Sequence, residues 1–379
     1  MNRVGIAGVG LTRFTKQPDR EAKSLVEEAV ELALIDARVG WNDIGAIFCG
    51  SAYADRNGNG QVCLRDLPTR GLPIVNVENA CASGSCAVHE AYAWVRAGLC
   101  DAALAVGMDK TSWVSGMLPM PGGRWYFDLG LMTPGWYGLQ ASRYMSLHGA
   151  TEVDLARVVV KSRALACHNP IAHFRSPVTV DEVLHSAMVS TPFTLHQCCP
   201  KTDGAGAVLV ASEEFIARHR LASVWIAGAR MVSGQPVFSD APAGESPAAV
   251  AARLALNQAN VDATDLDVVE VHDAFSIGEF LYAEALGLCG TGEYAEYLRS
   301  GRAMPNGGGV AVNPSGGLLS RGHPIGATGV AQIAEVVWQL RGLAHGRQID
   351  SACVGATLTM GAIEWERDAN VAVCFVLER

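Results

Sequence analysis

One segment combines a reactive side chain with small neighbours where a strand gives way to a helix. Ile74–Val77 is typical of a strand, and Cys81 follows it within Asn79–Gly84, at the start of a long expected helix. A helix N-terminus offers unpaired N–H groups and a positive dipole end, which favour a thiolate and lower a thiol pKa. The pattern indicates a nucleophilic cysteine, and a buried structural thiol is the alternative.

Two histidines from the second half of the chain occupy comparable places. Val268–Val271 predicts a buried strand, and His272-Asp273-Ala274-Phe275 comes directly after it. Polar residues at the carboxyl end of such a strand mark sites in α/β sheets, although a hydrogen-bonded core histidine is the alternative. His323 lies in Gly322-His323-Pro324-Ile325-Gly326 ahead of an expected helix, where proline and glycine fix a close-packed turn. A histidine held there could bond a thiolate or an oxyanion.

The elements that carry these residues repeat along the chain. The recurring pieces are Ile6–Gly8 and Ile226–Gly228, Asp43–Phe48 and Asp265–Val269, and Ala82–Gly84 and Ala327–Gly329. Amphipathic helices are expected between the first and second pieces, near 22–38 and near 248–260. Three similarities in the same order indicate a duplicated βαβ-type unit, and alternating strands and helices favour mostly parallel sheets covered on both faces.

We therefore expect an α/β fold in which duplicated βαβ halves form a five-layered α/β/α/β/α body. The N-terminal half takes residues 1–109 and 197–219, and the C-terminal half takes residues 220–379. Residues 110–196 have no counterpart in the second half, so we predict an inserted loop domain there. Insertions on rigid scaffolds usually shape a substrate site.

The predicted loop domain is dense in aromatic and methionine side chains, although aromatic residues make up only 7% of the chain. They are Trp113, Trp125, Tyr126, Phe127, Trp136 and Tyr137, with Met117, Met120 and Met132 among them. Aromatic rings bury large areas with a defined shape, so one interpretation is a pocket for a bulky or aromatic acyl group. Packing of an insertion that lacks its own core is the alternative.

Composition excludes several classes of protein. Of 379 residues, 49% are hydrophobic and 18% charged, which excludes a disordered chain, and a net charge of −9 disfavours nucleic acid as a partner. No apolar run is long enough for a membrane span. Eleven cysteines without a CxxC pair or an export signal favour a cytoplasmic protein with reduced thiols. The groups Cys167–His173 and His196–Cys199 lack zinc-site spacing, so we expect loop or core residues there and no metal.

The longer motifs resemble the thiolase superfamily, most closely its sterol-carrier-protein-type (SCP-x-like) branch, over essentially the whole chain. The segments that carry the resemblance are those around Cys81, Asp101–Gly107, Thr202–Ala207, His272–Phe275 and, most specifically, Asn313–Gly329. The resemblance implies an acyltransferase, a 3-oxoacyl-CoA thiolase, that uses CoA as a co-substrate and keeps no bound cofactor. A cysteine takes the acyl group as a thioester and then passes it to CoA.

By this resemblance, Cys81 is the nucleophile, and its backbone N–H contributes to an oxyanion hole. His323 activates the thiol and helps to form a second oxyanion hole. His272 stands where many thiolases have asparagine, and it holds a water or donates directly beside His323. A further cysteine in a Cys-x-Gly turn handles the substrate α-proton. Cys353-Val354-Gly355 fits that pattern, and a core thiol at a strand end is the alternative.

The resemblance also implies a homodimer or larger oligomer, and a small OB-fold partner with a zinc ribbon that helps to bind CoA. The chain lacks an obvious cationic patch for CoA phosphates, which favours such a partner. An aryl 3-oxoacyl-CoA such as benzoylsuccinyl-CoA suits the aromatic loop domain. Two other functions stay open: retro-aldol cleavage, whose thiolase-fold enzymes lack the cysteine, and a non-catalytic acyl- or lipid-binding subunit.

Overall fold

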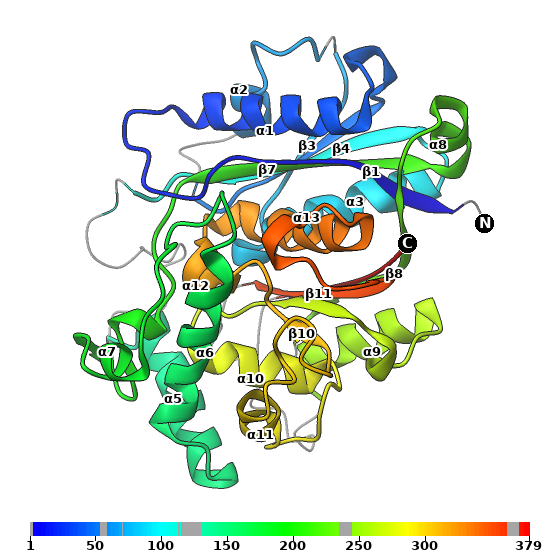
Figure 1. Ribbon diagram of the computed structural model, residues 1–379. Helices are drawn as coiled ribbons and strands as arrows, with labels where there is room; N and C mark the ends of the chain where they lie inside the picture. The colour runs from blue at the N-terminus through cyan, green and yellow to red at the C-terminus, as the bar shows by residue number, and fades with distance from the viewer. Residues whose placement is uncertain are drawn as a thin grey trace.

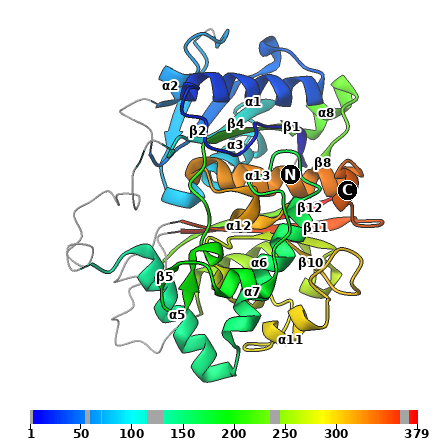
Figure 2. The ribbon, with the colours of Figure 1, turned by 60° about the vertical axis from the view of Figure 1, so that its left-hand side comes forward.

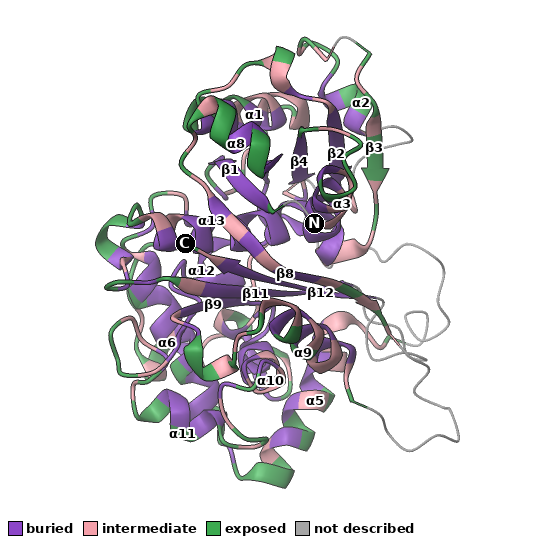
Figure 3. Ribbon diagram, turned by 90° about the vertical axis from the view of Figure 1, so that its right-hand side faces the viewer, coloured by how far each residue is buried: buried purple, intermediate pink, exposed green. Residues whose placement is uncertain are grey.

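The computed structural model describes residues 3–53, 59–69, 71–112, 114, 130–234, 245–361 and 371–379. Helices cover both outer faces of the body and also lie between its two layers of strands, so that five layers are stacked (Figure 1). Most strands and the middle helices are buried, whereas the outer helices and the edge strand β3 (Ile74–Val77) keep exposed residues (Figure 3). No helix in these ranges is long and apolar enough to cross a membrane.

The two strand layers repeat one topology. In the first, the spatial order is β1 (Val4–Leu11), β7 (Gly204–Ser212), β4 (Ala102–Asp109), β2 (Ala46–Gly50) and β3 (Ile74–Val77). In the second, it is β8 (Val224–Ser233), β12 (Val371–Glu378), β11 (Val354–Gly361), β9 (Val268–Val271) and β10 (Ala311–Val312). β1 and β8 join them at only two residue pairs, Gly5–Trp225 and Ile6–Val224. The duplicated α/β fold is confirmed.

The expectation of mostly parallel sheets is wrong. In each half the first two strand pairings are antiparallel and the last two are parallel. The antiparallel strand in the first half is β7, which enters the sheet after the long excursion through residues 110–196. Its counterpart β12 enters after residues 362–370. An alternation of strands and helices in the sequence cannot show that a strand joins its sheet after such a long segment. The residue limits of the two halves and of the loop domain stay a prediction.

Five helices build the covering layers. They are α1 (Ala22–Ala37) on the first sheet, α9 (Pro247–Ala259) and α10 (Ser276–Ala285) on the second half, and α3 (Ser83–Arg96) and α13 (Thr328–Arg341) in the middle. The expected helices near 22–38 and 248–260 correspond to α1 and α9. Nearly every α13 side chain is buried, as expected of a helix between two sheets.

The segment between β4 and β7 forms a separate group of helices. It contains α5 (Thr133–His148), α6 (Glu152–Ala166) and α7 (Val180–Leu184). Figures 1 and 2 place all three beside the second half, away from α1. α6 packs on α10, α11 (Tyr294–Arg299) and α12 (Gly317–Arg321). A buried ion pair, Lys161 Nζ to Glu279 Oε2 at 3.0 Å, fastens α6 to α10.

Replacement of Lys161 by methionine should destabilise the protein, because Glu279 would stay buried without its ion-pair partner. Loss of one partner of a buried pair lowers the free energy of unfolding by about 3–5 kcal/mol. The pair Arg218–Asp101, with 58% and 61% of its side chains exposed, offers the matched control Arg218→Met, which should change little. Urea denaturation measures both, and an unchanged midpoint for Lys161→Met would refute the anchoring role of this pair.

Candidate active site

A tight turn presents Cys81 at the N-terminus of α3. The residues Ala80–Ala82 form one 3₁₀ turn, in which Ala80 has a φ of 47°, a left-handed conformation that is uncommon for a residue with a Cβ. The Ser83 hydroxyl closes the turn, since it accepts from Asn79 N at 2.9 Å and donates to Ala80 O at 2.6 Å. This backbone holds Cys81 in one fixed place.

The turn that carries His323 comes from the other half and is fastened to the first. The buried carboxylate of Asp109, at the end of β4, accepts from Gly326 N at 2.6 Å. It also accepts from the Ser51 hydroxyl at 2.8 Å and from the N–H groups of Ala52 and Tyr53. Gly326 lies in the 3₁₀ turn Ile325–Ala327, which opens α13 as the turn of Cys81 opens α3. The duplicated turns therefore face each other.

His272 leaves the carboxyl end of β9, as the sequence predicts. Its neighbour Asp273 accepts from Leu318 N at 2.7 Å, and Glu270 forms a buried ion pair with Arg321 at 3.0 Å. Ser315 donates to Glu270 from its N–H and from its hydroxyl. These bonds fix the Asn313–Arg321 segment against β9, so the strand end and the histidine turn keep one relative position.

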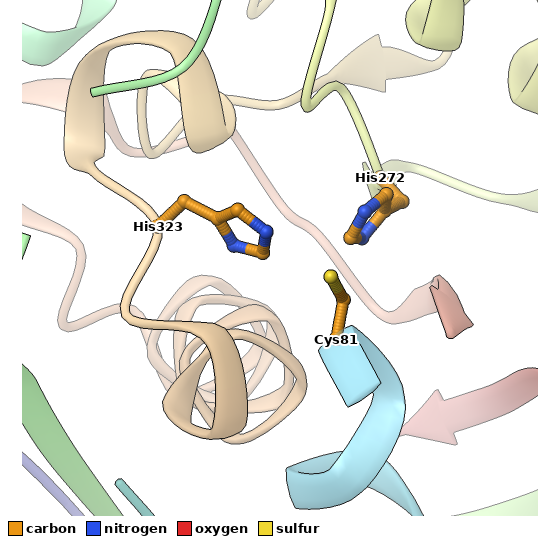
Figure 4. A group of neighbouring side chains, drawn as sticks. All are labelled: Cys81, His272 and His323. Carbon is orange, nitrogen blue, oxygen red and sulfur yellow. The ribbon is translucent and has the colours of Figure 1, made fainter. Parts of the chain in front are cut away.

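The structure brings Cys81, His272 and His323 together. The thiol sulfur and one ring nitrogen of each histidine all lie within 4.8 Å of one another. The two rings are 5.3 Å apart, nearly perpendicular, and the Cys81 sulfur points between them (Figure 4). Both histidines are buried, and His272 Nδ1 has no hydrogen-bond partner among the described residues. The site can thus offer a nucleophile, a base and a hydrogen-bonding nitrogen.

The hydrogen bonds around His323 favour one tautomer. Its Nδ1 lies 2.6 Å from the Thr328 hydroxyl, and that hydroxyl donates its single hydrogen to Pro324 O at 3.1 Å. Thr328 must then accept from His323, so Nδ1 carries the proton. The Nε2 lone pair is left for the Cys81 thiol, as a general base requires.

Desolvation disfavours the charged form of all three groups. Desolvation, with the positive charge of Arg321, lowers the pKa of His272 to about 3, and desolvation with the influence of His272 and Arg321 lowers that of His323 well below 6.5. Desolvation and the Asp109 carboxylate raise the pKa of Cys81 to about 12, although its own N–H lowers it. The expected thiolate at the helix start is therefore wrong for the resting protein. Tertiary burial outweighs the local dipole.

The same three side chains have the chemistry of a metal site. A thiolate and two imidazoles suit Zn²⁺, and they are the one such group of histidine, cysteine or carboxylate atoms found in the described part of the chain. The segments Cys167–His173 and His196–Cys199 contribute no further group of this kind there. A nucleophilic cysteine beside its general base is the other interpretation of this group. The tautomer of His323 and the turn that holds Cys81 suit that interpretation as well as they suit a metal site.

Two family models match the chain. Residues 4–214 match the one described as thiolase, N-terminal domain, and residues 230–373 match the one described as thiolase C-terminal domain-like. The chain belongs to the thiolase superfamily. The resemblance drawn from the motifs is confirmed.

Individual thiolase relatives cover almost the whole chain. It is 38% identical to the benzoylsuccinyl-CoA thiolase subunit BbsB of Thauera aromatica, over 92% of this chain and 91% of that protein. It is 35% identical to sterol carrier protein 2 of Gallus gallus, over 92% and 68%. The solved Ltp2-ChsH2(DUF35) aldolase has a TM-score of 0.85 at 26% identity, over 99% and 97%. Human mitochondrial 3-ketoacyl-CoA thiolase, at 16% identity, a TM-score of 0.73 and coverage of 100% and 98%, supports the fold alone.

The structure does not bring Cys353 to the site. Its exposed thiol donates to Ser351 O just before β11, whereas β11 runs parallel to β9 with Leu358 opposite Val271. The residue level with His272 is therefore Thr359, about 20 Å further along the strand at 3.3 Å per residue. A Cβ on Gly361 would lie 2.3 Å from Asn79 O, so this end of β11 packs on the Cys81 turn. Thr359-Met360-Gly361 stands where the expected Cys-x-Gly would be.

Three further side chains lie close enough to interact electrostatically with the Cys81 sulfur. They are Tyr53, Tyr137 and Cys199. Of these three, the sequence pointed only to Tyr137, as part of the aromatic segment. It predicted that Cys199 is a loop or core residue. Of that segment, Trp113, Met117, Met120, Trp125, Tyr126 and Phe127 fall outside the described residues.

Thr328→Val should slow acylation of Cys81, because Nδ1 of His323 loses its acceptor and the wrong tautomer becomes accessible. We expect a loss of about tenfold or more, a part of the about 100-fold or larger contribution of a general base. Thr357→Val is the matched control, since this buried hydroxyl has no hydrogen-bond partner in the described structure. Single-turnover acylation followed by mass spectrometry measures both variants. Equal losses would show that the tautomer is irrelevant.

Alkylation of Cys81 by iodoacetamide should rise with pH without levelling off between pH 7 and 9. A thiol pKa of about 12 leaves little thiolate at pH 7, and the fraction grows about tenfold for each pH unit below the pKa. The experiment uses a Cys353→Ser background, because the exposed Cys353 thiol would compete for the reagent. A plateau at or below neutral pH would instead indicate a resting thiolate–imidazolium pair.

Proposed function

We propose that the protein is a 3-oxoacyl-CoA thiolase that transfers an acyl group to CoA through a thioester on Cys81. The proposal rests on the Cys81 sulfur lying within 4.8 Å of nitrogens of His272 and His323. A neutral imidazole with a free Nε2 beside a neutral thiol is the resting state of a general-base pair, whereas a structural thiol needs no such partner.

In the proposed reaction, His323 Nε2 takes the Cys81 proton as the sulfur attacks the 3-oxo carbon. The oxyanion is stabilised by N–H donors, and each well-placed donor contributes on the order of 2.7–4 kcal/mol. The bond between C2 and C3 then breaks, which leaves the acyl group on Cys81 and a CoA thioester enolate beside His272. Protonation of C2 releases one acyl-CoA. The CoA thiolate then attacks the Cys81 thioester and carries the second acyl-CoA away.

A bulky or aromatic acyl group, as in benzoylsuccinyl-CoA, is the favoured substrate class. Tyr137 stacks on Phe275 with ring centres 4.7 Å apart, and Phe193 lies 5.4 Å from Phe275. Phe275 lies three residues after His272, and Cys81 acts electrostatically on Tyr137, which supports placing this aromatic group beside the site. The name of the Thauera aromatica relative points to the same substrate class.

We further propose a cytoplasmic homo-oligomer that works with an OB-fold, zinc-ribbon partner. A relative named as a subunit and a solved neighbour that contains a DUF35 protein support the partner, as does the net charge of −9. The edge strand β3 exposes Val75 and has no second strand neighbour in the described ranges, which favours pairing with another copy. All eleven cysteines are free, as in a reducing compartment.

Retro-aldol cleavage is the second candidate, because the aldolase structure matches this chain with a TM-score of 0.85. In that reaction no acyl group would be attached to Cys81. The two candidates therefore differ in whether an acyl–Cys81 thioester forms. A non-catalytic acyl-binding subunit would not form this thioester either.

Exposure of the protein to benzoylsuccinyl-CoA and to straight-chain 3-oxoacyl-CoA esters should add an acyl mass to Cys81. His323→Ala should slow this acylation at least about 100-fold. Cys353→Ser should leave it unchanged, because that thiol is exposed at the far end of β11. Intact-protein mass spectrometry, with and without the partner protein, gives the readout. Turnover without any adduct, persisting in Cys81→Ser, would favour the aldolase reaction instead.

A further inference from the structure

Besides the Cys81 proton, which His323 takes, the proposed reaction moves two further protons, and these need a second acid and base. The enolate that leaves after carbon–carbon cleavage must gain a proton at C2, and the incoming CoA thiol must lose one. Cys353 cannot serve, because it lies at the opposite end of β11. Thr359, level with the site, donates its hydroxyl to Gln332 Oε1 at 2.5 Å, and an aliphatic hydroxyl is too weak an acid and base.

Tyr137 is held at the site from the inserted segment. Its ring is 5% exposed and stacks on Phe275 at 4.7 Å, three residues after His272. Its hydroxyl lies 3.3 Å from the Tyr282 hydroxyl, and the Tyr282 ring lies 6.4 Å from the His272 ring. The two phenols thus lie near the imidazole that faces Cys81, and Cys81 is close enough to act electrostatically on Tyr137.

We propose that Tyr137 is the second proton-transfer residue, with Tyr282 as its positioning partner; this rests on the proposed thiolase function. The Tyr137 O–H bond breaks as its proton joins C2 of the enolate, which gives a phenolate and the released acyl-CoA. The phenolate then takes the proton of the incoming CoA thiol, which frees the thiolate that attacks the Cys81 thioester. The Cys81 thiolate that leaves regains its proton from His323, and Tyr137 ends each cycle protonated, so protons and electron pairs balance.

The surroundings of Tyr137 suit this cycle. Burial and the neighbouring Tyr282 raise its pKa well above 10, so the phenol stays protonated until a strong base such as the enolate forms beside it. The Tyr282 hydroxyl can then donate to the phenolate. Cys199 is the competing group, because burial, together with Cys198, Cys81 and Asp273, raises the pKa of its thiol as well, and the Cys199→Ser variant tests it.

Tyr137→Phe should abolish proton exchange at C2 while leaving the Cys81–His323 pair intact. We expect exchange of the α-hydrogens of acetyl-CoA and succinyl-CoA in D₂O, followed by NMR, to fall at least about 100-fold. The rate of Cys81 alkylation by iodoacetamide should stay within about twofold of the unmodified protein, since it needs no second acid or base. Tyr144→Phe, on the same helix but bonded to Glu284, is the matched control and should keep normal exchange.

Unchanged exchange in Tyr137→Phe would overturn the proposal, as would loss of exchange in Cys199→Ser with Tyr137 intact. If Tyr137→Phe does not fold, Tyr282→Phe provides the test. A fall of about tenfold in the exchange rate supports the proposed proton transfer by Tyr137, and normal exchange overturns it. Failure of the thiolase function itself is recognised separately. In that case the unmodified protein forms no acyl-Cys81 and exchanges no α-hydrogen.

Discussion

The close contact of two helix-opening turns, one from each half of the duplication, is the constraint on which the site depends. A Cβ on Gly84 would lie 2.2 Å from Gly326 O, so the middle helices can approach only because glycine stands there. Asp109 adds a bond to Gly326 N from the first half. Cys81 and His323 are neighbours because of this contact, and neither strand layer by itself would place them together.

The same packing sets the chemistry. Withdrawal of Cys81, His272 and His323 from water disfavours every charged form, so the trio rests as a thiol and two neutral imidazoles. In the proposed reaction, a charge would form only as substrate is attacked, when preorganised donors face it. The Thr328 hydroxyl becomes important in this setting, because an uncharged imidazole acts as a base only in the correct tautomer.

The duplication and three members of the site could be predicted from the sequence because these are local patterns: a repeated strand–helix unit, and reactive residues at a strand end or at the start of a helix. The sequence-based prediction misplaced Cys353, because a Cys-x-Gly pattern does not show how its strand is aligned with the neighbouring strand. Which residue of β11 lies beside His272 is decided by its parallel pairing with β9, and that pairing selects Thr359. The mixed direction of the sheets and the raised pKa of Cys81 also arise from contacts between distant segments.

The duplicated halves and the inserted segment supply different residues of the site. The duplicated halves hold the proposed nucleophile and its proposed base, whereas α5 supplies Tyr137, which stacks on Phe275. The ion pair between Lys161 and Glu279 links this insertion to α10, the helix that starts just after the His272 motif. The insertion and the His272 motif are therefore both positioned by α10. Under the proposed function, substitutions in α5 would change the acyl group accepted without disturbing Cys81 and His323. A thiolase scaffold can in this way acquire new substrates while its acylation machinery stays fixed.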